Sequence, residues 1–198
     1  MSGDLQSWLA GQGRWLPGDA LRLAAAASVP LAGAVAGGPS AAAMLLTLGG
    51  TMALRFVRAP AALDIAGQLV VLASAWLAVT GAYQVVPGLD TTAHLATGAV
   101  LALLARTVLL RLGLLPVTTS RRAAAARALH TVSAVVLLGL LWELGEWAGH
   151  AWFSPEIGVG YADTLIDLAA DGAGALLAAL LAERVTARER LLDAAPLR

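Results

Sequence analysis

Residues 123–153 read AAAARALHTVSAVVLLGLLWELGEWAGHAWF, and this stretch decides the fold class. A helix needs about 20 mostly apolar residues to cross the hydrocarbon core of a bilayer. The stretch exceeds that length, and its only charged residues are Arg127, Glu143 and Glu146. We therefore predict that it forms a long membrane-spanning helix.

The composition of the whole chain agrees with a membrane protein. Of the 198 residues, 59% are hydrophobic and 13% are charged, and that charged share is about half of what soluble proteins carry. This excludes disorder, nucleic-acid binding through a basic surface, and an ordinary cytosolic enzyme. The chain has no cysteine, which excludes disulfides, thiolate metal sites and cysteine nucleophiles. We predict an all-α polytopic helix bundle in contact with the lipid bilayer, with no nucleic-acid partner.

Five further apolar stretches, bounded by Gly, Pro and charged residues, make a total of six predicted crossings. The expected N-caps are Ser40 for the second helix and Thr91 or Thr92 for the fourth. The predicted helices cover residues 20–37, 40–56, 61–83, 91–112, 123–153 and 163–187. We treat 1–198 as a single membrane domain, made of an interfacial segment (1–19), the first three helices (20–87), the last three helices (88–187) and a cytoplasmic tail (188–198).

The arginines give the predicted orientation. All 13 basic residues are arginines, and in a six-helix arrangement every one of them falls on the same side. Five or seven helices would not separate them in this way. Because cytoplasmic loops carry the excess of basic residues, both termini are expected in the cytoplasm, with the chain in the bacterial cytoplasmic (inner) membrane.

Acidic residues and histidines gather on the opposite, outer side of the predicted bundle. They recur at helical spacing, so those of each helix share one face. With a rise of about 1.5 Å per residue, the stripes of the last two helices reach similar depths. The set comprises Asp90, His94, Glu143, Glu146, His150, Asp163, Asp167 and Asp171.

Six carboxylates in the outer half of a bundle need neutralisation, since each costs roughly 2.5–3.5 kcal/mol at mid-membrane. A bound divalent cation, shared protons or a water-filled cavity could supply it. Oxygen ligands with an imidazole suit Mg, Mn, Ca, Zn or Fe. The candidate metal ligands are the carboxylates of the fourth, fifth and sixth helices together with one histidine: Asp90, His94, Glu143, Glu146, Asp163, Asp167 and Asp171.

A structural role is an alternative for several of these residues. Asp90 and Asp163 could act simply as the N-caps of their helices, without a functional role. His94 or His150, taken singly, could be an interfacial or core histidine. Caps cannot explain the residues inside helices, which are Glu143, Glu146, Asp167 and Asp171. Small residues, including Gly174 of the sixth helix and Gly139, Gly145 and Gly149 of the fifth, are expected to let the acidic stripes approach closely.

The ordered motifs resemble a known family. Asp90-Thr-Thr-Ala-His94, Trp142-Glu143-Leu-Gly-Glu146-Trp147 and Asp163-Thr-Leu-Ile-Asp167 followed by Asp171-Gly-Ala-Gly are similar to the series carried by the YjdF-like bacterial inner-membrane proteins. A looser likeness to the VanZ-like family is weakened by Asp171, where that family has asparagine. The resemblance covers about residues 88–181, and it implies a multi-pass membrane protein without naming a reaction.

Three functions fit these patterns. The first is a divalent-metal-dependent enzyme acting on a lipid or lipid-linked substrate, with Glu143 or Glu146 as general base and His94 positioning metal or substrate. The second is a transporter coupled to protons or cations, or a binding protein for a cationic small molecule. The third is a scaffold or accessory protein. Association of the chain into a homo-oligomer is compatible with all three.

Overall fold

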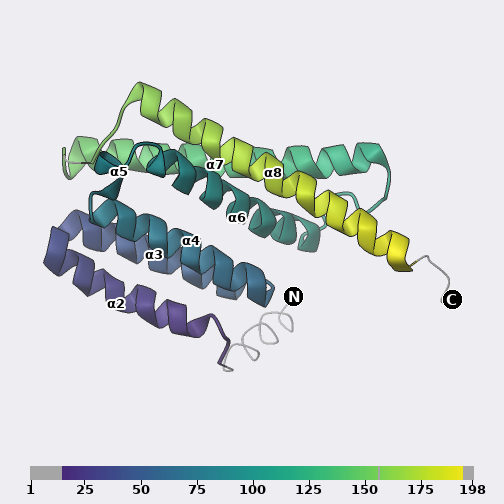
Figure 1. The fold of residues 1–198 in the computed structure, drawn as a ribbon, viewed down its shortest axis with the longest axis horizontal. Coiled ribbons are helices and arrows are strands. Elements are labelled where there is room, and N and C mark those ends of the chain that lie inside the picture. The colour runs from purple at the N-terminus through teal and green to yellow at the C-terminus, as the bar shows by residue number, and fades with distance from the viewer. Residues whose placement is uncertain (1–14, 156, 194–198) are drawn as a thin grey trace.

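The structure is a computed structural model that describes residues 15–155 and 157–193, and within this part every regular element is a helix (Figure 1). Most of the predicted interfacial segment and the end of the predicted tail lie outside the described residues. The elements are α2 (Asp19–Ala36), α3 (Gly38–Phe56), α4 (Ala61–Val79), α5 (Ala82–Val85), α6 (Leu89–Arg111), α7 (Arg121–Trp152) and α8 (Tyr161–Asp193).

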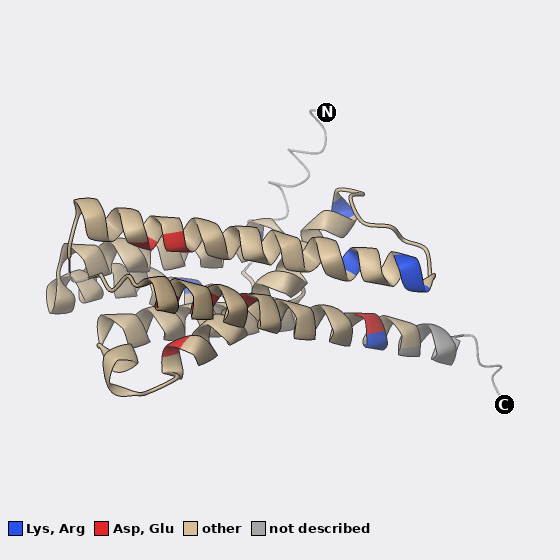
Figure 2. Cartoon of the chain, turned by 90° about the horizontal axis from the view of Figure 1, so that it is seen from above, with Lys and Arg blue, Asp and Glu red and all other residues tan. Residues whose placement is uncertain are grey.

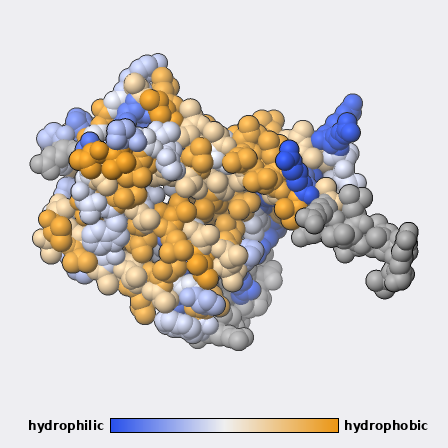
Figure 3. Space-filling view, in the orientation of Figure 1, coloured by the Kyte–Doolittle hydropathy of each residue, from blue (hydrophilic) through white to orange (hydrophobic). Residues whose placement is uncertain are grey.

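Five of these helices are long and apolar enough to cross a membrane: α2, α4, α6, α7, and α8 as far as Ala187. Large apolar side chains cover their outer surfaces, as on α7, where Leu137 and Leu141 are each 57% exposed. In Figure 3 such residues fill the middle of the visible face. An outward-facing leucine surface is favourable in lipid and costly in water, so the all-helical membrane fold is confirmed.

The six long helices form two groups of three, and the short α5 lies on the connection between them. α2, α3 and α4 pack together, as do α6, α7 and α8, and the main contact between the groups is made by α4 and α6 (Figure 1). At that contact, Gly67 of α4 lies against Val100 of α6. The predicted outer acids belong to the second group, and the first three helices connect to them through α6.

Several predicted helix ends were wrong. The third helix stops at Val79 rather than at residue 83, because Gly81 takes a left-handed conformation (φ 71°) that separates α4 from α5. Gly88 (φ 75°), not a threonine, precedes α6. α3 likewise begins without a side-chain cap at Ser40, and α8 continues to Asp193, into the predicted tail.

Small residues bring α6 and α8 into backbone contact, as predicted for Gly174. A Cβ on Gly174 would lie 2.0 Å from the Leu95 carbonyl oxygen, and one on Gly98 would lie 2.3 Å from that of Asp171. Gly139 of α7 also faces α8, whereas a Cβ on Gly145 would meet no atom within 4 Å, so the close approach predicted at Gly145 was wrong.

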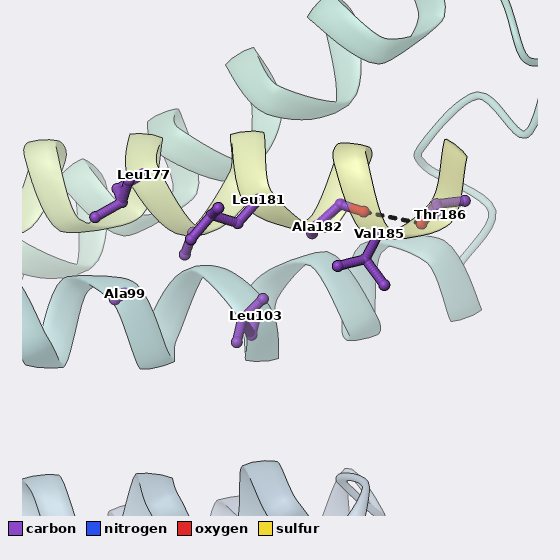
Figure 4. A pocket seen from close by; sticks show the side chains of 8 residues that line it. Ala99, Leu103, Leu177, Leu181, Ala182, Val185 and Thr186 are labelled. Carbon is purple, nitrogen blue, oxygen red and sulfur yellow. Dashed lines mark hydrogen bonds between the residues drawn. The ribbon is translucent and has the colours of Figure 1, made fainter. Parts of the chain in front are cut away.

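Toward their arginine-bearing ends, α6 and α8 leave an apolar groove of about 540 Å³ (Figure 4). Its lining includes Ala99 and Leu103 of α6 and Leu177, Leu181 and Val185 of α8. None of the predicted site residues lines this groove, so it is distinct from the outer cavity that the sequence indicated.

A layer of apolar side chains fills the centre of the second group. Ala102, Val135 and Ala175 are fully buried, and Ala178 is 7% exposed. We call these four residues the apolar layer. Each helix of the group contributes to it, and on each helix it lies between the acidic residues at one end and the charged residues at the other.

Candidate functional site

The N-terminal parts of α6 and α8 bring the predicted acids around one imidazole. His94 Nε2 lies 3.8 Å from Asp90 Oδ1 and 3.9 Å from Asp167 Oδ2. On the other edge of the ring, Nδ1 lies 3.4 Å from Asp171 Oδ1. One ligand atom each from Asp90, His94 and Asp167 fit within 4.8 Å of one another, which is compact enough for all three to bind one metal ion.

Two buried carboxylates at this end each have one oxygen without a hydrogen-bond partner. Glu143 is 7% exposed and Asp171 is 5% exposed, and neither Glu143 Oε1 nor Asp171 Oδ1 accepts a hydrogen bond. The 3.4 Å contact of Asp171 with His94 does not have hydrogen-bond geometry. A buried carboxylate oxygen without a donor carries a substantial desolvation cost, which a cation would offset.

Asp163 and Glu146 lie at the edge of the same group. Asp163 is exposed and is the third residue of α8, so it lies inside the helix and is not the N-cap. Its charge acts on Asp90 and Asp167. Glu146 is half-buried, and its charge interacts with those of Glu143 and His94. We call the whole set the acid cluster: Asp90, His94, Glu143, Glu146, Asp163, Asp167 and Asp171.

Tyr83 borders the acid cluster from α5. Its hydroxyl donates a hydrogen bond to the Ser74 carbonyl oxygen (2.9 Å). Burial raises the pKa of the Tyr83 hydroxyl above its usual value, and the charges of Asp90 and Glu146 act in the same direction against the opposing effect of the Ser74 hydrogen bond. Tyr83 therefore stays neutral at physiological pH.

His150 does not join the cluster. Its ring is exposed, and Nδ1 lies 2.7 Å from the Ile157 carbonyl oxygen, so it holds the loop between α7 and α8. Among the described residues, no arginine forms an ion pair with a member of the acid cluster.

The sequence reasoning missed a charged cluster in the first group of helices. Arg22 of α2 donates to Asp19 (Nη1 to Oδ1, 3.0 Å) and to Asp64 of α4, and Arg55 of α3 also donates to Asp19. Gln68 completes it by donating to Asp64 (3.2 Å). We call Asp19, Arg22, Arg55 and Asp64 the N-terminal ion-pair cluster; the signal for it was an acid, Asp64, inside an apolar helix.

A second ion-pair cluster joins the other three helices. The Glu183 carboxylate of α8 forms an ion pair with Arg106 of α6 (2.8 Å). It also accepts a hydrogen bond from Nε of Arg127 on α7 (2.8 Å). We call Arg106, Arg127 and Glu183 the C-terminal ion-pair cluster. Figure 2 shows that the arginines of α7 and α8 lie toward one end of these helices. The acidic residues near the start of α8 and the end of α7 lie toward the other end.

The two ion-pair clusters lie on the same side of the molecule. Arg111, at the end of α6, donates hydrogen bonds to the carbonyl oxygens of Val57 and Arg58 in the loop between α3 and α4 (3.1 Å for Arg58). The arginine-bearing ends of both helix groups therefore meet, as the predicted segregation of arginines requires.

The family follows from a comparison with protein-family models. The model described as "Predicted membrane protein (DUF2238)" matches residues 23–188. The chain belongs to this family. It is the YjdF-like family indicated by the motifs, and the match includes every residue of the acid cluster. No curated protein and no solved structure matches the chain.

Proposed function

We propose that the protein is a divalent-cation-dependent membrane enzyme whose metal site lies in the acid cluster. The observation that carries this proposal is the convergence of Asp90, His94 and Asp167, whose ligand atoms lie within 4.8 Å of one another. Two carboxylates and one imidazole are a donor set that Mn²⁺, Zn²⁺ and Fe²⁺ accept.

The surroundings of these three ligands support a cation. Glu143 and Asp171 each present a buried carboxylate oxygen without a hydrogen-bond donor, and Arg106 and Arg127 are paired with Glu183 at the other end of the helices. The carboxylates would repel one another without a positive charge among them.

The geometry also supports chemistry at the site. Three protein ligands leave positions on a metal ion for water, which the ion acidifies. The Asp90 side chain is 36% exposed, so the site opens at that end to molecules from outside the bundle. Glu146, half-buried beside the ligands, is the candidate general base, and a lipid or lipid-linked ester is the proposed substrate class.

The apolar layer favours an enzyme over a transporter. Ala102, Val135 and Ala175 are fully buried between the acid cluster and the next buried polar groups, which are Thr131 of α7 and the C-terminal ion-pair cluster. An ion passing through would have to cross this layer without polar ligands, which is costly. A site reached from one side is what an enzyme at the membrane surface requires.

A six-crossing topology with cytoplasmic termini belongs to the same proposal. α2 and α3 are packed antiparallel, and Arg22 at the start of α2 and Arg55 at the end of α3 share Asp19. If α2 crosses the membrane, α3 therefore returns to the starting side. The arginines then face the cytoplasm, and the acid cluster faces outward in a bacterial inner membrane.

The test of the metal site is Mn²⁺ titration of the purified full chain, followed by electron paramagnetic resonance. We expect one bound Mn²⁺ per chain, lost in His94→Ala and in Asp167→Asn. His130→Ala is the matched control, because His130 is exposed and its Nδ1 lies 2.7 Å from the Ala126 carbonyl oxygen of its own helix. No saturable binding to the wild-type chain would refute the proposed site.

The topology can be tested cleanly because the chain contains no cysteine. Single cysteines replace Ala36, Val86 and Val117, all exposed in connections or at helix ends, and intact cells are treated with a membrane-impermeant maleimide. Six crossings predict labelling at positions 36 and 86 and protection at 117. If positions 36 and 117 share a side instead, α3 does not cross and the topology is wrong.

A further inference from the structure

Asp171 occupies a socket at the junction of three helices. A Cβ on Gly98 of α6 would lie 2.3 Å from the Asp171 carbonyl oxygen, and a Cβ on Gly139 of α7 would lie 2.7 Å from Asp171 Oδ2. Two glycines on two neighbouring helices therefore leave the space that the backbone and the carboxylate of Asp171 fill. The residue is 5% exposed, so its carboxylate has little freedom to leave this position.

The socket holds Asp171 against one edge of His94. Asp171 Oδ1 lies 3.4 Å from Nδ1, whereas Nε2 lies on the opposite edge, near Asp90 and Asp167. An ion bound at Nε2 would lie on the side of the ring away from Nδ1 and Asp171. Asp171 is accordingly absent from the compact ligand group, although the sequence suggested it as a ligand.

A histidine that binds a metal must offer an unprotonated nitrogen. The hydrogen bond made by the other nitrogen decides which tautomer is present, and such partners of metal-binding histidines contribute strongly to affinity. A carboxylate beside Nδ1 can only accept a hydrogen bond, so it selects the tautomer with the proton on Nδ1 and leaves Nε2 free. Contacts of this kind are often long before the ligand binds and tighten afterwards.

We propose that Asp171 is a positioning residue, which accepts the Nδ1 proton of His94 so that Nε2 faces the cation, and that Gly98 and Gly139 form the socket holding it in place. This inference rests on the proposed cation site, because it assigns the group that orients one of its ligands. It separates Asp171 from Asp90 and Asp167, which contact the cation directly.

The first experiment reads the tautomer of His94 by nitrogen-15 NMR of the histidine-labelled full chain with Zn²⁺ bound, because without a cation the surrounding carboxylates favour the imidazolium, which is protonated on both nitrogens. The chain has three histidines, and His94→Ala assigns the signal of interest. We expect the Nδ1-protonated form in the wild type and a shift toward the Nε2-protonated form in Asp171→Asn, whose amide can donate to Nδ1. A wild-type His94 protonated on Nε2 would overturn the inference, even if Asp171→Asn failed to fold.

The second experiment measures Mn²⁺ affinity in matched glycine variants. Gly139→Ala places a methyl group against Asp171 Oδ2, whereas Gly145→Ala, on the same helix, meets nothing within 4 Å. We expect Gly139→Ala and Asp171→Asn to weaken Mn²⁺ binding by about 10- to 100-fold. Gly145→Ala should leave the affinity unchanged. Equal Mn²⁺ affinity in all four proteins would overturn the role of Asp171 while leaving the cation site intact.

The experiments distinguish failure of the proposed cation site from failure of the positioning role of Asp171. Absence of Mn²⁺ binding in the wild type removes the cation site, and with it the function assigned to Asp171. Binding in the wild type with an unchanged His94 tautomer in folded Asp171→Asn removes only the positioning role. Unfolding temperatures recorded without Mn²⁺ identify a variant that loses affinity merely because its fold is damaged.

Discussion

Asp64 and Asp167 are buried alike, at 5% and 4% exposure, yet their partners differ completely. Asp64 receives a guanidinium from Arg22 and an amide from Gln68. Asp167 faces His94, with further carboxylates nearby. Similar burial of the same chemical group is thus compensated by an arginine at one end of the molecule, whereas at the other end a single imidazole is shared among several carboxylates.

This difference separates a structural cluster from a candidate binding site. An acid with its own arginine needs nothing from outside, and the N-terminal ion-pair cluster joins three helices in that way. The acid cluster has one imidazole among six carboxylates, so its net charge depends on what it binds. Perturbed, unpaired charges of this kind are typical of functional sites.

Arg22→Met should disrupt the N-terminal ion-pair cluster and cause the largest change in the free energy of unfolding. The substitution leaves Asp64 without its guanidinium, and loss of one partner of a buried ion pair costs about 3–5 kcal/mol. We expect the free energy of unfolding in detergent to fall by that amount. Arg184→Met, at an exposed arginine of α8, is the control. Equal stability of the two variants would show that the N-terminal ion-pair cluster contributes nothing.

Mn²⁺ should stabilise the folded protein only by binding to the acid cluster. At a free concentration of 100 times Kd, a ligand that binds the folded state adds about 2.7 kcal/mol to the free energy of unfolding. We expect this gain in the wild type and, because distant sites add independently, an equal gain in Arg22→Met. A chelator should remove it, and His94→Ala should not show it. A gain that survives in His94→Ala would place the bound ion elsewhere.

The same conservative change should have opposite signs at the two ends in metal-free buffer. Asp64→Asn removes a paired charge and should lower stability. Glu143→Gln removes an unpaired one and should raise the free energy of unfolding by about 1 kcal/mol, part of the roughly 2.5–3.5 kcal/mol that a carboxylate costs at mid-membrane. Chemical denaturation of the two variants measures both. A loss of stability in Glu143→Gln would mean that its carboxylate already has a stabilising partner.

The sequence was most informative where helix periodicity decides the outcome. Spacing of three residues placed Glu143 and Glu146 together, and spacing of four placed Asp167 and Asp171 together, before any tertiary contact was known. The predicted close approach through Gly174 also holds. Helix ends were less predictable, because the break between α4 and α5 depends on the left-handed backbone conformation of Gly81, which the sequence does not specify.

Tertiary partners could not be predicted from spacing. Asp19 and Arg55 are 36 residues apart, and they meet only because α2 and α3 pack antiparallel. Asp64 carried a readable signal, a single acid in an apolar helix with Gln68 one turn later, but its partner depends on which helix lies beside it. Likewise, which nitrogen of His94 faces which carboxylate requires the ring orientation.

The apolar layer has a consequence for turnover. Because Ala102, Val135 and Ala175 block the interior below His94, a reactant entering beside Asp90 and the product formed from it must use the same opening. A product that stays bound then excludes the next reactant. Under the proposed function we therefore expect competitive inhibition by product and release rates that limit the overall cycle.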